Sequence, residues 1–371
     1  MRRAILHVIV LGALGLAIVL APISREALAG ARAHQAQQGQ QQQGQQQQQG
    51  QQQTPPPQLP GGAQITVSAQ LVSVDAVVTD SDGNFLSGLK KENFRILEDG
   101  KPQIISSFSP AGEAPITIVL LLEFRANMAT YNYASYVATH WAPEFLRNVK
   151  TNDWVALMDF DLKVRVDKDF TQNTYEILDE LRQMQVPLFS EACIYDAVVE
   201  TLDRLQDVHG KKAILLIASG RDTFSKHTLD QTLKIVRQSD VSIYSLCLTQ
   251  NVLNANITGN SPGGSGNINT AQDFNQMRAF SELTGGQAWN PNFSAEVPDI
   301  MRSIAMSLRN QYSLGYNPGP GSLDGKYHKI KVELVNADGT PYVFTDQKGK
   351  KKKLVVYARQ GYTAKEASAA D

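Results

Sequence analysis

This 371-residue sequence lacks a framework of disulfides, catalytic motifs and a large excess of charge of either sign. Each absence reduces the number of functions that are compatible with the sequence. Its two cysteines, Cys193 and Cys247, are too few for a scaffold of disulfides. We interpret them as core thiols, with a single disulfide as the alternative. The 35 basic and 36 acidic residues leave a net charge of −1, so the chain has no general electrostatic attraction for nucleic acid.

Sequence signatures of catalysis are absent as well. No two of the six histidines stand at the spacing of metal ligands, and there is no Gly-x-Ser-x-Gly elbow, P-loop or dinucleotide-binding fingerprint. Ser190-Glu191 and Ser219-Gly220 fall on predicted loops where α/β folds bind ligands, yet the sequence identifies no base beside either serine. We therefore predict that the protein is not an enzyme and holds no cofactor.

The amino terminus has the layout of an export signal. Arg2 and Arg3 precede an apolar run over Ala4–Ile23, and Ala27-Leu28-Ala29 supplies the small residues of a cleavage site. Residues 1–29 are predicted to be a signal peptide. The alternative is an uncleaved anchor, because about 20 apolar residues also span a bilayer. Either way we expect the protein to be periplasmic, associated with the cell envelope or secreted, touching the membrane only through this segment if it stays uncleaved.

Two further segments are predicted to be disordered. Residues 30–63 form a tether, in which a stretch rich in Gln and Gly leads into a stretch rich in Pro. Such a composition buries too little apolar surface to offset the entropy lost on ordering. The tail at 363–371 is expected to be disordered too.

Alternating apolar residues predict a small β domain over residues 64–112. Strand signals cover Ile65–Val78, Glu92–Leu97 and Gln103–Phe108, and turns rich in Asp and Gly separate them. Further strands are expected in the C-terminal segment 313–362, at Lys326–Leu334 and Lys353–Ala358. We expect these to join the N-terminal strands in one β domain.

Residues 113–312 alternate between strand and helix signals, which predicts an α/β domain with a mostly parallel sheet covered on both faces. A flexible loop is expected at 250–272. Strands are expected at Ile116–Leu122, Trp154–Phe160 with Val164–Val166, Ala213–Ala218, Ser242–Leu248 and Gln287–Trp289. Helices are expected at Tyr131–Val149, which Pro143 kinks or divides, and at Thr174–Met184, Tyr195–Leu205, Leu229–Arg237, Phe274–Leu283 and Val297–Leu308.

Several short segments carry a family resemblance when they are taken in order. They are Val72–Val74 through Glu98–Pro102, Asp169–Thr171, Ile194–Ala197, Leu283–Gly286, Gln311–Tyr316 and Arg359–Tyr362. In this order they resemble the von Willebrand factor type A-related proteins best represented in Acidobacteria, from about Ile65 to Tyr362. The resemblance implies a Rossmann-like von Willebrand type A domain, together with a small β-sandwich-like domain built from N- and C-terminal strands.

Domains of this family often carry a metal-ion-dependent adhesion site, formed by Asp-x-Ser-x-Ser after the first strand and by a Thr and an Asp from later loops. The resemblance places the first motif at Glu123-Phe124-Arg125-Ala126-Asn127, the Thr position at Ala192 and the Asp position at Ser219. Every expected ligand differs. Arg125 would hold a permanent positive charge where a cation belongs, so we predict a degenerate, metal-free site.

Two roles for Arg125 are compatible with the sequence. It pairs internally with Glu123 or Asp222, or it faces solvent and receives a carboxylate of a partner in a bidentate contact. A rearranged site of Glu123, Asn127 and Asp222 that holds Mg²⁺ or Ca²⁺ is the alternative to a metal-free edge.

The predicted function is that of an exported protein-binding or adhesion-type module. It meets a protein or another macromolecule of the envelope through an edge that contains Glu123, Arg125, Asn127, Ala192, Ser219 and Asp222. The alternatives are a structural or assembly scaffold of the cell envelope and a hydrolase with an unrecognised site.

Overall fold

The computed structural model describes residues 71–112, 114–126, 136–185, 187–248, 268–319, 322, 324–346 and 348–364, without the side chains of 268–270. The predicted signal peptide, the predicted tether and Asn127 lie outside these residues. The chain divides into two units, Met1–Ile65 and Thr66–Asp371, and all described residues belong to the second unit. Within the described part of the chain, no helix combines the length and the apolar composition needed to cross a membrane.

A six-stranded sheet forms the centre of the α/β domain, in the order β10-β9-β8-β5-β6-β7. All neighbouring strands are parallel except the edge strand β7, which runs antiparallel to β6. The first strand along the chain, β5, therefore lies in the middle, as in doubly wound folds. The strands are β5 Ile116–Glu123, β6 Trp154–Phe160, β7 Val164–Thr171, β8 Lys211–Ala218, β9 Ser242–Cys247 and β10 Ala288–Trp289.

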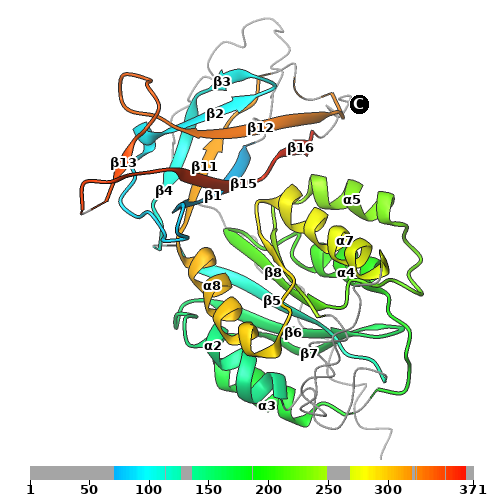
Figure 1. Ribbon diagram of the computed structural model, residues 1–371. Helices are drawn as coiled ribbons and strands as arrows, with labels where there is room; N and C mark the ends of the chain where they lie inside the picture. The colour runs from blue at the N-terminus through cyan, green and yellow to red at the C-terminus, as the bar shows by residue number, and fades with distance from the viewer. Residues whose placement is uncertain are drawn as a thin grey trace, which may run out of the picture. The chain divides into compact units, whose positions relative to one another are not determined.

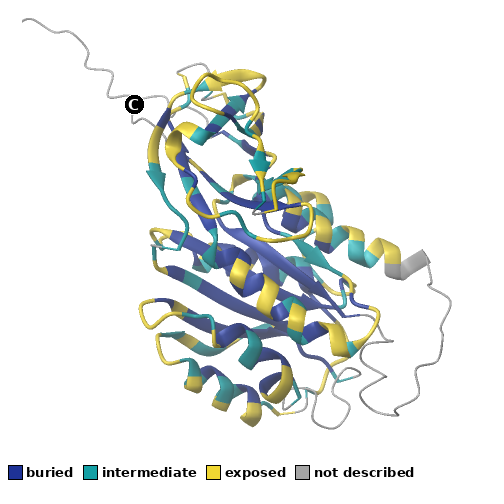
Figure 2. Cartoon of the chain, turned by 60° about the vertical axis from the view of Figure 1, so that its left-hand side comes forward, coloured by how far each residue is buried: buried dark blue, intermediate teal, exposed yellow. Residues whose placement is uncertain are grey.

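Helices cover both faces of this sheet (Figure 1) because its central strands carry apolar side chains on both sides. In β5, Ile118, Leu120 and Leu122 pack into one core, whereas Val119 and Leu121 pack into the other. Figure 2 shows the buried sheet between helices whose outer faces are exposed. One layer holds a π-helical turn at Val137–Trp141, α2 Ala142–Leu146, α3 Thr174–Gln183 and α8 Val297–Arg309, and the other holds α4 Ile194–Arg204, α5 Leu229–Gln238 and α7 Ile268–Thr284.

Two predicted boundaries in this domain differ from the structure. Helix α7 begins at Ile268, inside the predicted flexible loop 250–272 and six residues before Phe274. Its first turn carries too few apolar residues to show helical periodicity in the sequence. The helix predicted at Tyr131–Val149 ends at Leu146, and its predicted interruption by Pro143 agrees with the described part, a π-helical turn followed by the short helix α2 with Pro143 in its first turn. Pro143 lacks the amide hydrogen that an unbroken helix needs at that point.

Strands from the two ends of the described chain pair with one another in a separate β region (Figure 1). Its two four-stranded sheets have the orders β15-β1-β11-β4 and β16-β12-β2-β3. Side chains from both sheets, among them Val74, Ile96 and Tyr316, share one apolar core. The strands are β1 Val72–Asp80, β2 Phe94–Glu98, β3 Lys101–Gln103, β4 Ile105–Ser109, β11 Gln311–Tyr316, β12 Tyr327–Leu334, β15 Leu354–Ala358 and β16 Gly361–Thr363, and a separate hairpin joins β13 Phe344–Thr345 to β14 Lys351–Lys352.

The β region also corrects two sequence predictions. The single strand predicted at Gln103–Phe108 is divided, because the chain passes from one sheet to the other at Ile104, which is 88% exposed. At the C-terminus, β16 continues to Thr363, and the amide of Ala364 donates to the carbonyl of Lys326 at 2.9 Å. The ordered chain therefore runs past the predicted start of the tail at 363, because backbone pairing holds these residues.

Candidate functional site

The candidate site lies at the carboxyl end of the parallel sheet, where the connections after β5 and β8 leave on opposite faces. The chain after β5 enters the layer of α2, and the chain after β8 enters the layer of α5. Doubly wound sheets bind their ligands at such a divergence. Glu123 is the last residue of β5 and Ser219 follows the last residue of β8, so the fold brings these two residues together.

Glu123 is fully buried, and both of its carboxylate oxygens are engaged. Oε2 accepts a hydrogen bond from the backbone amide of Ser219 at 2.5 Å, and Oε1 accepts one from the Ser219 hydroxyl at 3.0 Å. The Nε of Arg125 donates to the same Oε1 in an ion pair. A buried carboxylate is tolerated only with such partners, so Glu123 is a built part of this edge.

Arg125 is turned inward. It is 7% exposed, and besides Glu123 it contacts the carbonyl of Ser190 through Nη1 at 3.1 Å and the hydroxyl of Ser219 through Nη2 at 3.5 Å. The structure thus matches the internal pairing with Glu123 and not the solvent-facing role. Three of the five N–H groups of this guanidinium are bound inside the domain, and the side chain is buried, so little of it is left for a partner carboxylate.

Gly220 holds the loop after β8 against helix α7. Its φ is +82°, and a Cβ added there would stand 2.5 Å from the backbone oxygen of Asp273. Both the left-handed backbone and the close approach require glycine. Arg221, the next residue, pairs with the Asp273 carboxylate at 3.4 Å. Burial raises the pKa of Asp273, and the neighbouring guanidinium opposes that rise.

Ala192 and Asp222 belong to a second group beside the buried pair. The carbonyl of Ala192 accepts hydrogen bonds from the amides of Thr223 at 2.8 Å and Phe224 at 3.0 Å. The Asp222 carboxylate accepts one from the hydroxyl of Ser225 at 2.5 Å. Asp222 therefore fixes its own loop, and it forms no hydrogen bond or ion pair with Glu123 or Arg125.

These residues do not fit a divalent cation. The Glu123 oxygens are taken by Arg125 and Ser219, and the guanidinium lies where a cation would need space and negative charge. Asp222 bonds elsewhere, and Asn127 lies outside the described residues. Among the residues that the structure does describe, no group of three His, Cys, Asp or Glu is placed to hold a metal ion.

An acid–base pair does occur at this edge, near the end of β6. Burial and the neighbouring Asp159 raise the pKa of Asp167 to about 8, and Arg165 pairs with Asp159 at 2.5 Å. The two carboxylates line a cavity of about 380 Å³ whose described lining contains no Ser, Thr, Cys or His. The described lining therefore offers this pair no hydroxyl, thiol or imidazole group to activate.

The two cysteines offer no nucleophile either. Cys193 and Cys247 are free and buried, and burial raises the pKa of each thiol to about 12. Both are protonated at neutral pH, when a thiol is a poor nucleophile.

Three exposed apolar side chains flank the buried pair and were not predicted from the sequence. Leu188 is 88% exposed, Phe189 is 42% exposed and Phe224 is 59% exposed. The carbonyl of Phe189 accepts from the amide of Ala126 at 2.7 Å, so its backbone is tied to the loop of Arg125. The sequence shows these residues only as large apolar residues in otherwise polar loops. That pattern does not distinguish exposed side chains from buried ones.

No protein-family model and no curated protein matches the chain. Similar solved structures include the von Willebrand factor domain of the pilus tip protein Mfa5 of Porphyromonas gingivalis, with 9% identity and a TM-score of 0.39 over 52% of this chain and 95% of that one. BatB of Bacteroides thetaiotaomicron has 13% identity and a TM-score of 0.36 over 52% and 98%. Proximal thread matrix protein 1 of the mussel byssus has 9% identity and a TM-score of 0.42 over 57% and 50%.

Proposed function

We propose that this chain is an exported, non-enzymatic module that binds a protein partner through the carboxyl edge of its α/β sheet. The observation that carries the proposal is the group of exposed apolar side chains Leu188, Phe189 and Phe224 on loops anchored to the buried Glu123–Arg125 pair. Aromatic side chains at the centre of a contact are typical of protein interfaces.

The backbone under these side chains is held in place before any partner arrives. Ala126 binds the carbonyl of Phe189, Arg125 binds the carbonyl of Ser190, and Ala192 accepts the amide of Phe224. Such preorganisation lowers the entropy lost on binding. On this interpretation the Glu123–Arg125 pair supports the binding loops from below and does not touch the partner.

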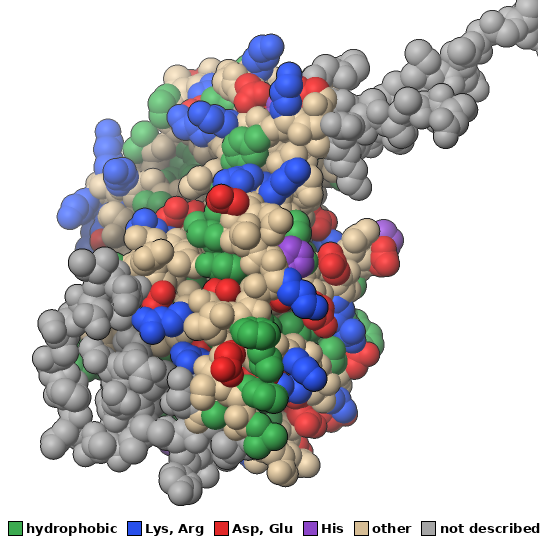
Figure 3. Space-filling model, turned by 90° about the vertical axis from the view of Figure 1, so that its right-hand side faces the viewer, with side chains coloured by type: hydrophobic (Ala, Val, Ile, Leu, Met, Phe, Trp, Pro, Cys, Tyr) green, Lys and Arg blue, Asp and Glu red, His purple; other side chains and the backbone are tan. Residues whose placement is uncertain are grey.

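The same arrangement supports a metal-free mode of binding. An adhesion site that uses a cation needs an open ligand position, whereas here a guanidinium already neutralises the buried carboxylate. The partner contact would then be mainly apolar. On the face drawn in Figure 3, acidic and basic side chains are interspersed, which favours a protein partner over a nucleic acid.

Site-specific photo-crosslinking in the cells that produce the protein tests the partner edge. A photoreactive phenylalanine replaces Phe224, and the matched control replaces Tyr175, which is 74% exposed. Tyr175 follows β7, whose end at Thr171 pairs with Val155 at the opposite edge of the sheet. We expect the photoreactive group at position 224 to crosslink to one protein, and an excess of the protein without the group to reduce this crosslink. The same group at position 175 is expected not to crosslink to that protein. Equal labelling from both positions would overturn the proposed edge.

Calorimetric titration of Mg²⁺, Mn²⁺ and Ca²⁺ tests the metal-free site. We expect no heat and no change in melting temperature, because Arg125 already neutralises the Glu123 carboxylate. Saturable binding that is lost in Glu123→Ala or Asp222→Ala would instead support the rearranged site.

A scaffold role would be favoured if binding of the partner survives the triple change of Leu188, Phe189 and Phe224 to Ser.

Export is proposed from the leader alone. The mass of the protein recovered outside the cytoplasm is expected to match a chain that begins at Gly30. A full-length mass in the membrane fraction would indicate an uncleaved anchor.

A further inference from the structure

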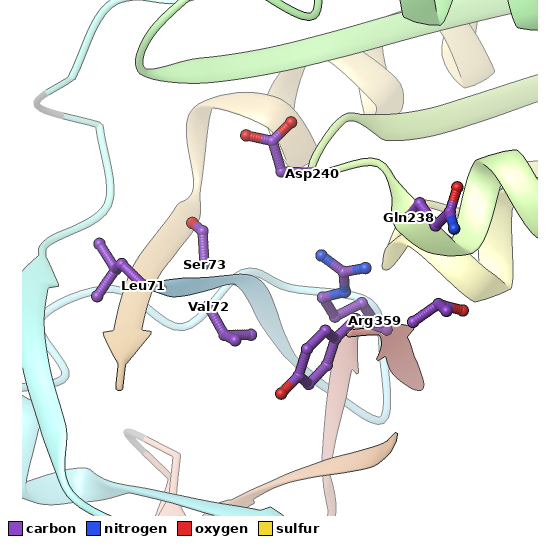
Figure 4. A pocket seen from close by; sticks show the side chains of 8 residues that line it. Leu71, Val72, Ser73, Gln238, Asp240 and Arg359 are labelled. Carbon is purple, nitrogen blue, oxygen red and sulfur yellow. The ribbon is translucent and has the colours of Figure 1, made fainter. Parts of the chain in front are cut away.

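A second buried arginine lies at the junction of the β region and the α/β domain. Arg359 follows β15 and is 7% exposed, yet its guanidinium borders a cavity of about 250 Å³. Figure 4 shows the guanidinium directed into the space between Gln238 and Asp240. These two residues precede β9, so the cavity is at the amino edge of the sheet, opposite the Glu123–Arg125 pair.

The charge of Arg359 has no full counter-charge among the described residues. Its Nε donates to the carbonyl of Gly361 at 3.0 Å, and Nη2 donates to the carbonyl of Arg237 at 3.2 Å. Within the described chain, no carboxylate oxygen lies within 4.0 Å of its nitrogens. Arg237 is in the last turn of α5, and the end of a helix contributes roughly half a negative charge. The carboxylates of Asp240 and Asp75 act on the guanidinium only from beyond the distance of an ion pair, so Arg359 has no direct counter-ion among the described residues.

The surroundings of Arg359 favour an added anion. Exposed Ser73 and Gln238 offer a hydroxyl and an amide that donate hydrogen bonds, and Thr363 offers another hydroxyl. Asp240 is the one carboxylate among the described lining residues, and it is already paired with Lys212 at 2.8 Å. Burial lowers the pKa of Arg359, yet an arginine stays protonated at neutral pH, so the pocket keeps its cation.

We propose that the Arg359 pocket binds a carboxylate, which completes the neutralisation of this guanidinium. Arginine and carboxylate match in shape and form paired, charge-assisted hydrogen bonds. The cavity of about 250 Å³ suits a short dicarboxylic acid or the terminal residue of a peptide, and not a larger ligand. This binding is independent of the partner edge.

Titration calorimetry on the exported protein tests the proposal with three probes. They are succinate, the tripeptide acetyl-Gly-Gly-Ala with a free carboxylate, and the same peptide as its amide. We expect at least one of the two acids to bind and the amide not to bind. Succinate alone would identify a free acid as the ligand, and the peptide acid alone would identify a chain terminus. The proposal is overturned if neither acid binds at millimolar concentration, or if the amide binds equally well.

Variants at exposed lining positions keep the test separate from folding. Gln238→Glu puts a negative charge in the pocket and is expected to raise the dissociation constant about tenfold or more. Gln206→Glu makes the same change at an exposed position outside the lining and is expected to leave it unchanged. Asp240→Asn is expected to tighten binding, because it removes the carboxylate that the described part of the lining contains. An unchanged dissociation constant in Gln238→Glu, or weaker binding in Asp240→Asn, would contradict the proposed site.

Discussion

Arg125 and Arg359 are equally buried, at 7% exposure each, but they are neutralised in opposite ways. Arg125 has the carboxylate of Glu123 as its direct partner at the carboxyl edge of the sheet. Arg359 has only backbone carbonyls as hydrogen-bond acceptors at the amino edge and borders a cavity. The difference shows that burial alone does not make a charged side chain structural. Arg125, with a direct counter-ion, supports the fold, whereas Arg359, without one, is the cation for which we propose a ligand.

Removal of the counter-ion of Arg125 is expected to have the largest effect. Glu123→Gln leaves a buried guanidinium unpaired and should lower the free energy of unfolding by about 3–5 kcal/mol. Urea denaturation measures this loss. The surface pair Arg95–Glu333 provides the control, and Glu333→Gln should cost no more than about 1 kcal/mol. The double change Glu123→Gln with Arg125→Met should recover most of the loss, and a larger loss would contradict the neutralisation of Arg125 by Glu123.

The loop that closes over this pair gives the next largest effect. Gly220→Ala combines a positive φ with a Cβ at 2.5 Å from the Asp273 carbonyl oxygen, so we expect a loss of about 2–3 kcal/mol. Gly210 has φ +94° with no atom within 4 Å of the added Cβ, and Gly210→Ala should cost only about 1 kcal/mol. Thermal unfolding of the two variants distinguishes the close approach from the backbone strain. Equal losses would mean that the loop yields at Asp273.

Removal of the unpaired arginine should matter little for stability. Arg359→Met eliminates a buried charge that no described carboxylate contacts directly, so the free energy of unfolding is expected to stay within about 1 kcal/mol of the parent. Urea denaturation in buffer without organic acids measures it. A loss as large as that of Glu123→Gln would mean that the two arginines are alike, and the comparison would fail.

His328 is another buried side chain that carries a positive charge, and a rise in pH removes that charge. It is 8% exposed, and although burial lowers its pKa, hydrogen bonds to Asp99 and Asp324 outweigh that effect and raise it above 6.5; the Glu98 carboxylate also faces the ring. The folded state therefore holds the proton more tightly than the unfolded state. Its stabilisation is fully present below pH 6.5 and is lost as the pH rises through the raised pKa.

Unfolding measured from pH 5 to pH 9 tests this expectation. The stability of the parent should fall relative to His328→Gln as the pH rises above 6.5. A difference between the two proteins that stays constant with pH would show that His328 titrates normally. Because neutral glutamine still forms hydrogen bonds, the variant separates the charge of His328 from its packing.

Periodicity in the sequence was enough to identify most of the elements of the α/β domain. The runs at Ile116–Leu122 and Ala213–Ala218 are continuous and apolar, since these strands are buried on both faces, and each lies within the strand found there. Prediction failed where local signals are weak. The first turn of α7 has few apolar residues, and the passage between two sheets at Ile104 leaves no mark in an alternating pattern.

The sequence by itself determined that an arginine stands two residues after Glu123 at the end of a central strand, because residue spacing along a strand is local. Only the tertiary structure decided that this guanidinium turns inward to Glu123, the Ser190 carbonyl and Ser219, since those groups come from different loops. The same holds for Arg359, whose pocket brings together residues from both regions. Hydrogen bonding and desolvation depend on distances in space, and the fold alone sets those distances.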